Sequence, residues 1–503
     1  MNAPFKPAGH APAKPDVDVA ILGSGFSGLG MAIALLKDGR RDFVILEKAQ
    51  GVGGTWRDNT YPGCACDIPS HLYSFSFEPN PQWSRMYPSQ PEIRAYLERV
   101  ADKYDLRRYL RFGCTVTDLT FDEAGGFWRV TSEGGQVLTA RVVVSGMGGL
   151  SRPILPNIKG MDRFKGKTFH SAWWDHDYDL TGKAVAVIGT GASAIQFVPQ
   201  IAPKVKSLTL FQRTPSWVMP KKDREMHGWE RALFRAAPAF QKLLRGLIYT
   251  RLELLATALV WRTESMAKFE KLGRQFIEAA ISDPVLRQKV TPTYRMGCKR
   301  ILISNDYYPA LARPNVDLVT DGIAEITAKG VRTTNGVEHP VDVIVYGTGF
   351  AATDALSPTQ VYGRGGRHLN AEWEAGAQAY LGVTVSGYPN FFMLMGPNTG
   401  LGHNSIVYMI ESQIRHVMDG LRRMDAAGAI SMDPKRESQN AFNAFVQERV
   451  GKTVWNAGGC KSWYLTEDGR NTTIWPGFTF DYRRRVKAID PAAYDMERVK
   501  TEA

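Results

Sequence analysis

The sequence predicts an α/β protein with two Rossmann-like dinucleotide-binding domains and a helical insertion. Two observations carry this prediction. Near the N-terminus a strand, a glycine-rich turn, a helix and a second strand follow one another within about 30 residues, and the same succession recurs from residue 183. Between residues 222 and 289 glycine is scarce and apolar residues recur at helical spacing, which is typical of an inserted helical segment.

The first unit begins with an apolar run, Val17–Leu22, which predicts a buried strand. A helix is expected over Phe26–Lys37 and a second strand over Asp42–Glu47. The intervening turn has the spacing G-x-G-x-x-G, which permits a tight turn, a close approach of backbone to pyrophosphate, and close packing of helix on strand. A carboxylate at the end of the second strand is placed to accept hydrogen bonds from ribose hydroxyls. The predicted dinucleotide contacts are Gly23, Gly25, Phe26, Ser27, Gly28 and Glu47.

The second unit has the strand Lys183–Ile188, a helix over Ser193–Ile201 and a strand over Leu208–Phe211. This second strand ends without a carboxylate, and a guanidinium there suits a ribose 2′-phosphate. The sequence therefore favours NADPH over NADH, with a solvated, uninvolved arginine as the alternative. The predicted contacts are Gly189, Thr190, Gly191, Ala192, Ser193, Arg213 and Thr214.

Composition limits the remaining function classes. The chain has 503 residues and a net charge of +12, but no basic run and no nucleic-acid-binding motif, so no nucleic-acid partner is expected. No apolar stretch approaches the roughly 20 residues that span a bilayer, and Met1–Lys14 has no apolar core of a signal peptide. Five sparse cysteines give neither a metal site nor a disulfide framework and predict a reducing, cytoplasmic compartment.

Two dinucleotides on one chain imply hydride transfer from one to the other. A disulfide reductase would need a paired redox-active cysteine motif, yet neither C-x-x-C nor C-x4-C occurs, and Cys64 and Cys66 do not fit. Oxygen is the remaining common acceptor.

The stretch Phe164–Asp175 fits the pattern F-x-G-x-x-x-H-x-x-x-W-D. It resembles the fingerprint of type I Baeyer–Villiger monooxygenases, flavoproteins that use FAD and NADPH. Related N- and S-oxygenating enzymes usually carry Tyr or Phe where Trp174 stands, which favours ketone oxidation. Further stretches that resemble the family are Gly53–Trp56, Tyr61–Gly63, Cys66–Pro69 and Lys299–Arg300 with Asp306–Tyr308.

The resemblance implies conversion of ketones to esters or lactones by O2 through a C4a-peroxyflavin. Arg300 matches the cation beside the peroxide and the oxyanion of the adduct, and Asp67 matches the carboxylate that positions it. His170 matches a histidine that links the domains. The resemblance also adds cofactor contacts, namely Thr55, Trp56, Asp67, Tyr73 and Val116 for FAD, and Lys299 and Trp463 for NADPH. For Trp463, ordinary core packing is the alternative.

The predicted division of the chain gives an FAD-binding domain at 1–151 and 349–503, an NADP-binding domain at 152–222 and 296–348, and the insertion at 223–295. The insertion either packs, covers the active site as a lid, or faces lipid. Two other functions stay open. One is N- or S-oxygenation by the same flavin chemistry, and the other is a catalytically idle flavin-binding or membrane-associated redox module.

Overall fold

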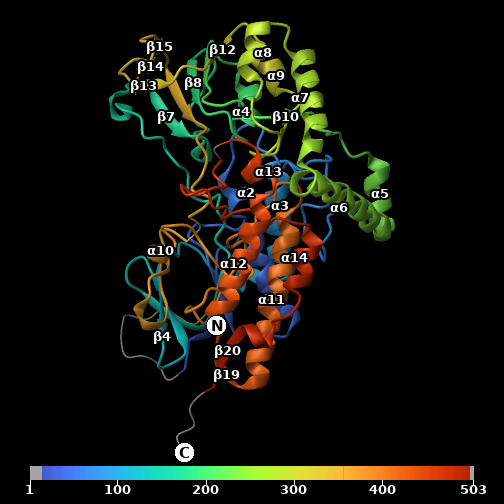
Figure 1. Cartoon of the computed structure of the whole chain (residues 1–503), viewed down its shortest axis with the longest axis vertical. Coiled ribbons are helices and arrows are strands. Elements are labelled where there is room, and N and C mark those ends of the chain that lie inside the picture. The colour runs from blue at the N-terminus through green and yellow to red at the C-terminus, as the bar shows by residue number, and fades with distance from the viewer. Residues whose placement is uncertain (1–13, 355, 461, 499–503) are drawn as a thin grey trace, which may run out of the picture.

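The computed structural model describes residues 14–354, 356–460 and 462–498. Figure 1 shows two sheet-centred parts, one toward each end of the long axis, with helices between and beside them. The prediction that Met1–Lys14 is not a signal peptide falls, except for Lys14, outside the described residues.

The larger sheet is built on the first predicted unit. β1 (Val17–Leu22) and β2 (Phe43–Leu46) run parallel and α1 (Phe26–Lys37) connects them, within a residue of the predicted bounds. Both strands are almost fully buried because structure covers both faces of this parallel region. The strand order is β17 (Gln360–Tyr362), β4 (Val116–Asp122), β5 (Phe127–Ser132), β6 (Val137–Ser145), β1, β2 and β3 (Leu110–Arg111), and β18 (Phe391–Met393) also pairs with β6.

The C-terminal part of the chain returns to this sheet. β18 runs parallel to β6 with Phe392 opposite Val144, and α11 (Ile406–Ala427) packs against α1. At the helix crossing a Cβ on Gly30 would lie 2.9 Å from Ile414 Cδ1, so the missing side chain permits the close approach.

The second sheet is entirely parallel. Its order is β12 (Val316–Val319), β9 (Ser207–Phe211), β8 (Ala184–Ile188), β16 (Val343–Tyr346) and β7 (Lys167–His170). α4 (Ala194–Ile201) follows the second glycine turn, as predicted. The smaller sheets pair β13 (Ile323–Ile326), β14 (Gly330–Thr333) and β15 (Glu338–Pro340), then β10 (Val218–Met219) with β11 (Leu302–Ile303), and β19 (Ala429–Pro434) with β20 (Tyr494–Arg498).

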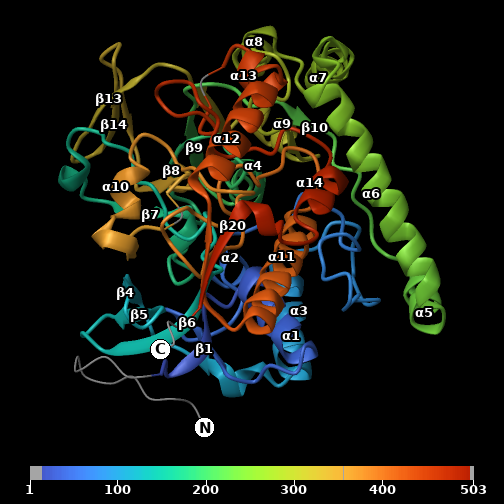
Figure 2. The same ribbon diagram turned by 60° about the horizontal axis from the view of Figure 1, so that its bottom comes forward.

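The predicted insertion is helical. It contains α5 (Gly228–Ala236), α6 (Pro238–Val260), α7 (Met266–Ala280) and α8 (Pro284–Val290). In Figures 1 and 2 α6 lies along the outer edge of the molecule, with α5 at its far end and away from both sheets. The remaining α-helices are α2 (Thr55–Asp58), α3 (Gln90–Lys103), α9 (Tyr307–Leu311), α10 (Leu369–Glu372), α12 (Arg436–Gly451), α13 (Val454–Ala457) and α14 (Thr479–Arg485).

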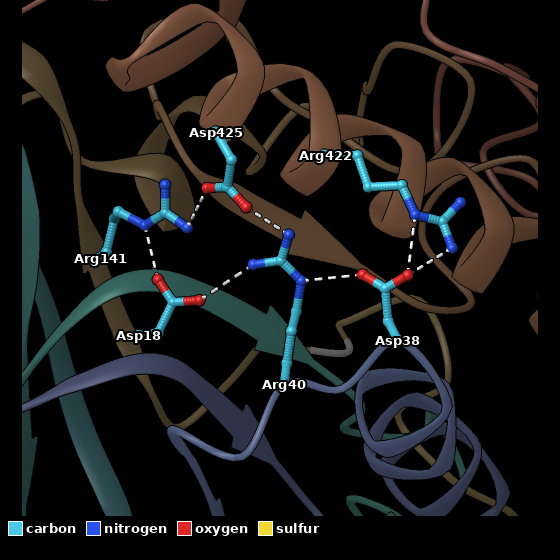
Figure 3. Close-up of polar contacts among 6 residues, drawn as sticks. All are labelled: Asp18, Asp38, Arg40, Arg141, Arg422 and Asp425. Carbon is cyan, nitrogen blue, oxygen red and sulfur yellow. Dashed lines mark hydrogen bonds and ion pairs between the residues drawn. The ribbon is translucent and has the colours of Figure 1, made fainter.

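An ion-pair network fastens α11 to the first unit (Figure 3). Arg141 of β6 donates to Asp18 of β1 at 2.6 Å and to Asp425 of α11 at 2.9 Å. Arg40 contacts Asp18, Asp38 and Asp425, and Arg422 of α11 donates to Asp38 at 2.6 and 2.9 Å. Each charged side chain therefore has at least two oppositely charged partners or, for Arg422, donates twice to one partner. These six residues form one connected network and not a set of isolated surface ion pairs.

The cysteines depart from the expectation of a reducing compartment. Cys298 and Cys460 form a disulfide although 162 residues separate them. Cys64 and Cys66 are free and buried, and Cys114 is free and partly buried. The sequence did not reveal the pair because cysteine spacing cannot show a contact between distant segments.

Within the described ranges no helix has the length and apolar character needed to cross a membrane. The same residues contain no group of three or more His, Cys, Asp or Glu side chains arranged to hold a metal ion.

The network predicts an acid-sensitive contribution to stability. Burial alone would raise the pKa of Asp38, but hydrogen bonds from Arg422 and Arg40 outweigh it and hold this pKa below its ordinary value. The stabilisation is therefore present at neutral pH and lost as pH falls through the folded-state pKa. Asp38→Asn should lower the free energy of unfolding at neutral pH by about 1 kcal/mol and less in acid. Urea titrations at both pH values measure this difference.

The exposed Asp317→Asn on β12 is the matched control, with little expected change at either pH. An Asp38→Asn variant as stable as the parent at neutral pH would contradict the assigned role of the network.

Candidate cofactor and active site

The first glycine turn follows β1 and leads directly into α1. Gly23 has a φ of +91°, and a Cβ on Gly28 would lie 1.8 Å from the Gly23 carbonyl oxygen, so only glycine permits this packing of helix on strand. Around Gly25 the space is open, because an added Cβ would lie 3.9 Å from Gly54 Cα, an ordinary contact distance. No side chain caps α1, so its first N–H groups are available to a phosphate. The turn thus fits a dinucleotide pyrophosphate.

Glu47 points back at this turn. Its Oε2 accepts hydrogen bonds from Ser24 N at 2.9 Å and Ser24 Oγ at 2.7 Å, and its Oε1 accepts from Ala49 N at 3.0 Å. Arg57 Nη1 lies 3.0 Å from Oε1. The carboxylate therefore lies beside the predicted nucleotide site. Ser24 and Arg57, its partners, were missed by sequence reasoning; Ser24 occupies a variable position of the glycine pattern.

An aromatic cluster lines the next part of the site. Phe26 at the start of α1 meets Tyr73 edge to face with ring centroids 5.2 Å apart. Trp56 of α2 donates from Nε1 to Tyr73 Oη at 3.1 Å. Thr55 begins the same short helix, and Ser27 is buried in α1. The cluster brings together residues that the resemblance assigned to FAD.

Val116 lies apart from this cluster, at the start of β4. It is 8% exposed, and its carbonyl oxygen accepts a hydrogen bond from Thr359 Oγ1 at 2.8 Å. The structure places it in the first sheet rather than among the aromatic residues.

The second glycine turn has the same design. Gly189 has a φ of +109°, and a Cβ there would lie 2.4 Å from the Gly347 carbonyl oxygen. Among the described residues, no atom beyond Gly191 and its two chain neighbours lies within 4 Å of a Cβ placed on Gly191, which leaves its backbone open to a phosphate. Thr190 is buried and its hydroxyl lies 3.4 Å from the carbonyl oxygen of Thr214. Ala192 is exposed and Ser193 half-buried at the start of α4.

Two cations meet beside this turn. Arg213, just after β9, is exposed. Burial and the nearby Arg213 guanidinium together lower the pKa of Lys299. The Lys299 ammonium lies 5.3 Å from the ring centroid of Tyr294, whose hydroxyl donates to the Pro215 carbonyl oxygen at 2.9 Å. An unneutralised pair of like charges here fits a dianionic 2′-phosphate, and Tyr294 is a supporting residue that the sequence did not indicate.

Arg300, which directly follows Lys299, meets Asp67 near Tyr73 of the aromatic cluster. Arg300 Nε and Nη2 donate to Asp67 Oδ2 at 2.9 and 2.5 Å, and Nη1 lies 3.4 Å from the Leu401 carbonyl oxygen. The attraction of the Asp67 carboxylate raises the pKa of Arg300 above its ordinary value. Both side chains are about a third exposed, at 35% and 29%, so the pair is accessible from solvent.

Tyr464 is a further member of this site that sequence reasoning missed. Burial raises its pKa to about 12, and it interacts electrostatically with Arg300. Its buried hydroxyl has no hydrogen-bond partner within the described part of the chain, and no sequence motif marks it.

Trp463 precedes Tyr464 and packs against it with centroids 4.5 Å apart. Its side chain is 51% exposed. The alternative of ordinary core packing is therefore wrong, and the indole is accessible to a ligand. The Cys298–Cys460 disulfide joins the segment just before Lys299 to the segment just before Trp463.

The fingerprint stretch ends at the junction of the two sheets. His170 ends β7, is 1% exposed, and accepts a hydrogen bond from Ala172 N. Trp174 packs on Phe197 of α4 at 5.3 Å. Beside it, Gln196 of α4 bonds to the Tyr61 hydroxyl and the Ala65 carbonyl oxygen, both at 3.0 Å. The second glycine-turn helix is thereby tied to the segment that carries Asp67.

The comparisons with known proteins agree with this geometry. The family model described as "Flavin-binding monooxygenase-like" matches residues 16–355. The chain is 52% identical to a Baeyer–Villiger monooxygenase of Pseudomonas aeruginosa, covering 95% of this chain and 91% of that protein. It is 52% identical to one of Streptomyces coelicolor, covering 98% and 95%.

Among solved structures, an oxidised steroid monooxygenase bound to NADP superposes with a TM-score of 0.86 and 32% identity. The superposition covers 96% of this chain and 99% of that one. Together with the two glycine turns and the fingerprint at their junction, these relationships place the chain in the flavin-binding monooxygenase-like family, among its Baeyer–Villiger monooxygenases.

Proposed function

We propose that this FAD- and NADPH-dependent monooxygenase uses O2 to convert a ketone to an ester or lactone, with Arg300 as its catalytic cation. The observation that carries the proposal is the Arg300–Asp67 pair, which lies near Tyr73 of the aromatic cluster, directly follows Lys299 in the chain and is open to solvent. Reduced FAD, when bound, supplies the oxygen-activating chemistry. The chain's own residues must then bind the ketone and stabilise the negative charge that develops on its carbonyl oxygen.

Arg300 is suited to that task. Guanidinium carries five N–H donors, and Asp67 engages only Nε and Nη2. The contact of Nη1 with Leu401 is long, at 3.4 Å, so this nitrogen keeps donors for a developing oxyanion. The raised pKa keeps the charge in place at any working pH, and preorganised charge of this kind lowers the barrier without reorganisation. Asp67 acts as a positioning residue.

Oxygenation at nitrogen or sulfur is the alternative that the sequence left open, and the relatives do not support it. Such a reaction has an electrophilic oxygen donor and develops no carbonyl oxyanion, so it needs Arg300 less. The name shared by the two relatives at 52% identity favours ketone oxidation.

The proposed NADPH pocket consists of the Gly189–Ser193 turn with Arg213, Thr214 and Lys299. The electrostatic contact of Lys299 with Arg213 supports it, because a 2′-phosphate relieves the repulsion between them. Trp463, exposed beside Tyr464, is proposed to contact the nicotinamide cofactor.

We further propose the domain division made from the sequence. The strand pairing supports it, because β17 and β18 from the C-terminal part join the first sheet while β16 joins the second. A cytoplasmic location stays a prediction, which the sparse cysteines support and the Cys298–Cys460 disulfide opposes.

The first prediction for the candidate site concerns Arg300. Arg300→Ala should lower the rate of ester formation at least about 100-fold, because it removes the donor to the oxyanion. Reduction of the flavin by NADPH should persist, because this step needs no oxyanion donor. Stopped-flow bleaching of the flavin and mass spectrometry of products from a ketone and a thioether separate the two effects.

The control is Arg295→Ala, which removes a neighbouring cation that pairs with Glu270. Substantial ketone turnover by Arg300→Ala would overturn the assigned role. Equal losses with ketone and thioether would overturn the distinction between the two chemistries.

The second prediction concerns cofactor choice. Arg213→Ala should raise KM for NADPH about 10- to 100-fold and leave that for NADH nearly unchanged, because a charge-assisted contact with phosphate is lost. Steady-state oxidation of both cofactors measures this, with the exposed Arg313→Ala as control. Equal efficiency of the parent enzyme with NADPH and NADH would refute the phosphate pocket.

The third prediction concerns pH. Since the pKa of Lys299 is lowered, its positive charge disappears at a lower pH than that of an ordinary lysine. The value of kcat/KM for NADPH should therefore fall as pH rises through this pKa, and Lys299→Arg should shift the fall to higher pH. A profile identical in the parent and the variant would show that Lys299 is not in the pocket.

A further inference from the structure

Helix α6 carries an apolar stripe on its outward face. Phe240, Leu247, Leu254 and Trp261 recur every seven residues, the last at the helix C-cap, and Leu243 falls on the same face. These side chains are between 47% and 68% exposed. We call these five residues the α6 stripe. A protein rarely leaves a contiguous row of large apolar side chains in water unless that surface binds something.

The position of α6 leaves the stripe accessible. The opposite side of the helix packs inward, where Glu253 accepts hydrogen bonds from Thr479 and Asn404, and Tyr249 stacks on Tyr408. Both views show α6 along the outer edge of the molecule (Figures 1 and 2). With 23 residues, it is about 34 Å long.

The exposed charges on α5 and α6 themselves have one sign. They are the cations Arg235, Lys242 and Arg251, and Arg231 is partly exposed; the exposed carboxylates Glu225 and Glu264 lie just outside the two helices. Both acidic residues of these helices are buried, Glu230 against Arg224 and Glu253 in the contacts given above. An apolar row on helices whose own exposed charges are cations matches a surface that is apolar inside and anionic outside.

We propose that the α6 stripe binds the surface of an anionic phospholipid bilayer, with the helix lying in the interface. Aromatic rings mark both ends of the surface, Trp229 of α5 and Phe240 at one end and Trp261 at the other, and such rings favour the headgroup region. Arg251, four residues after Leu247 and three before Leu254, stands beside the stripe where it reaches lipid phosphates. No part of the proposal requires α6 to cross the bilayer.

A second copy of the chain fits this surface less well. The midpoint of the stripe falls next to Arg251, so pairing with a copy in either direction would bring Arg251 close to its counterpart. No solvent-facing carboxylate on α5 or α6 offsets this repulsion.

Flotation of the FAD-loaded enzyme with vesicles tests the proposal. The enzyme should float with equimolar phosphatidylcholine and phosphatidylglycerol, much less with phosphatidylcholine alone, and less at high salt. The double variant Leu247→Ser with Leu254→Ser should reduce binding to anionic vesicles at least about ten-fold, because it removes two exposed leucines that the bilayer would bury. Lys242→Ser with Arg251→Ser should reduce it as well.

Two matched controls lie on the far side of the molecule, near the β13–β15 sheet. They are Val337→Ser, an apolar residue that is 49% exposed, and Lys329→Ser, an exposed cation, and both should bind vesicles like the parent. NADPH oxidation in solution should be unchanged in every variant, which separates this test from that of the catalytic site.

Three results would overturn the proposal: no flotation with anionic vesicles, equal flotation with neutral ones, or flotation that survives the leucine substitutions. A dimer in light scattering without lipid that the leucine substitutions abolish would assign the stripe to self-association instead.

Discussion

A single charge pair sets the geometric requirement that the fold must meet. Asp67 and Arg300 are 233 positions apart, one in the segment after β2 and the other where the helical insertion ends. Their contact brings the segment that carries Lys299 close to the aromatic cluster, because both Asp67 and Arg300 act electrostatically on Tyr73. Gln196 of α4 and the disulfide near Lys299 reinforce this approach from two sides. The need for this contact accounts for the order of the chain, in which each predicted dinucleotide-binding domain is made of two separate stretches.

Local patterns predicted the parts of the fold that depend on neighbours in sequence. α1 has the predicted bounds and β1 matches Val17–Leu22, because strand–turn–helix geometry is encoded within about 20 residues. The antiparallel β4–β5–β6 strands were not predicted, nor was the α11 ion-pair network. Both depend on partners far along the chain, such as Asp425 with Arg141.

The candidate site shows the same division. The glycines and Arg213 could be predicted from their spacing in the sequence. Arg300, Asp67 and Trp463 could be predicted only from the resemblance to the family. Tyr464 and Tyr294 carry no motif, because their importance comes from burial beside Arg300 and Lys299. The partners of Glu47 were missed for a related reason. The sequence shows that the carboxylate lies at the end of a strand, but it does not show that the hydroxyl and the amide of Ser24 donate to it.

The Cys298–Cys460 bond also acts on the denatured chain. It closes a ring of more than 160 residues that contains β16, β18 and α11. In the chain-entropy model a closure of this size reduces the freedom of the unfolded polypeptide by an amount worth on the order of 5 kcal/mol. Once a thiol reagent has reduced the disulfide, the unfolded chain is linear. Without the reagent, the unfolded chain of the same sequence still contains the closed ring. Heat resistance and refolding yield therefore depend on whether Cys298 and Cys460 are oxidised or reduced, and not on the sequence alone.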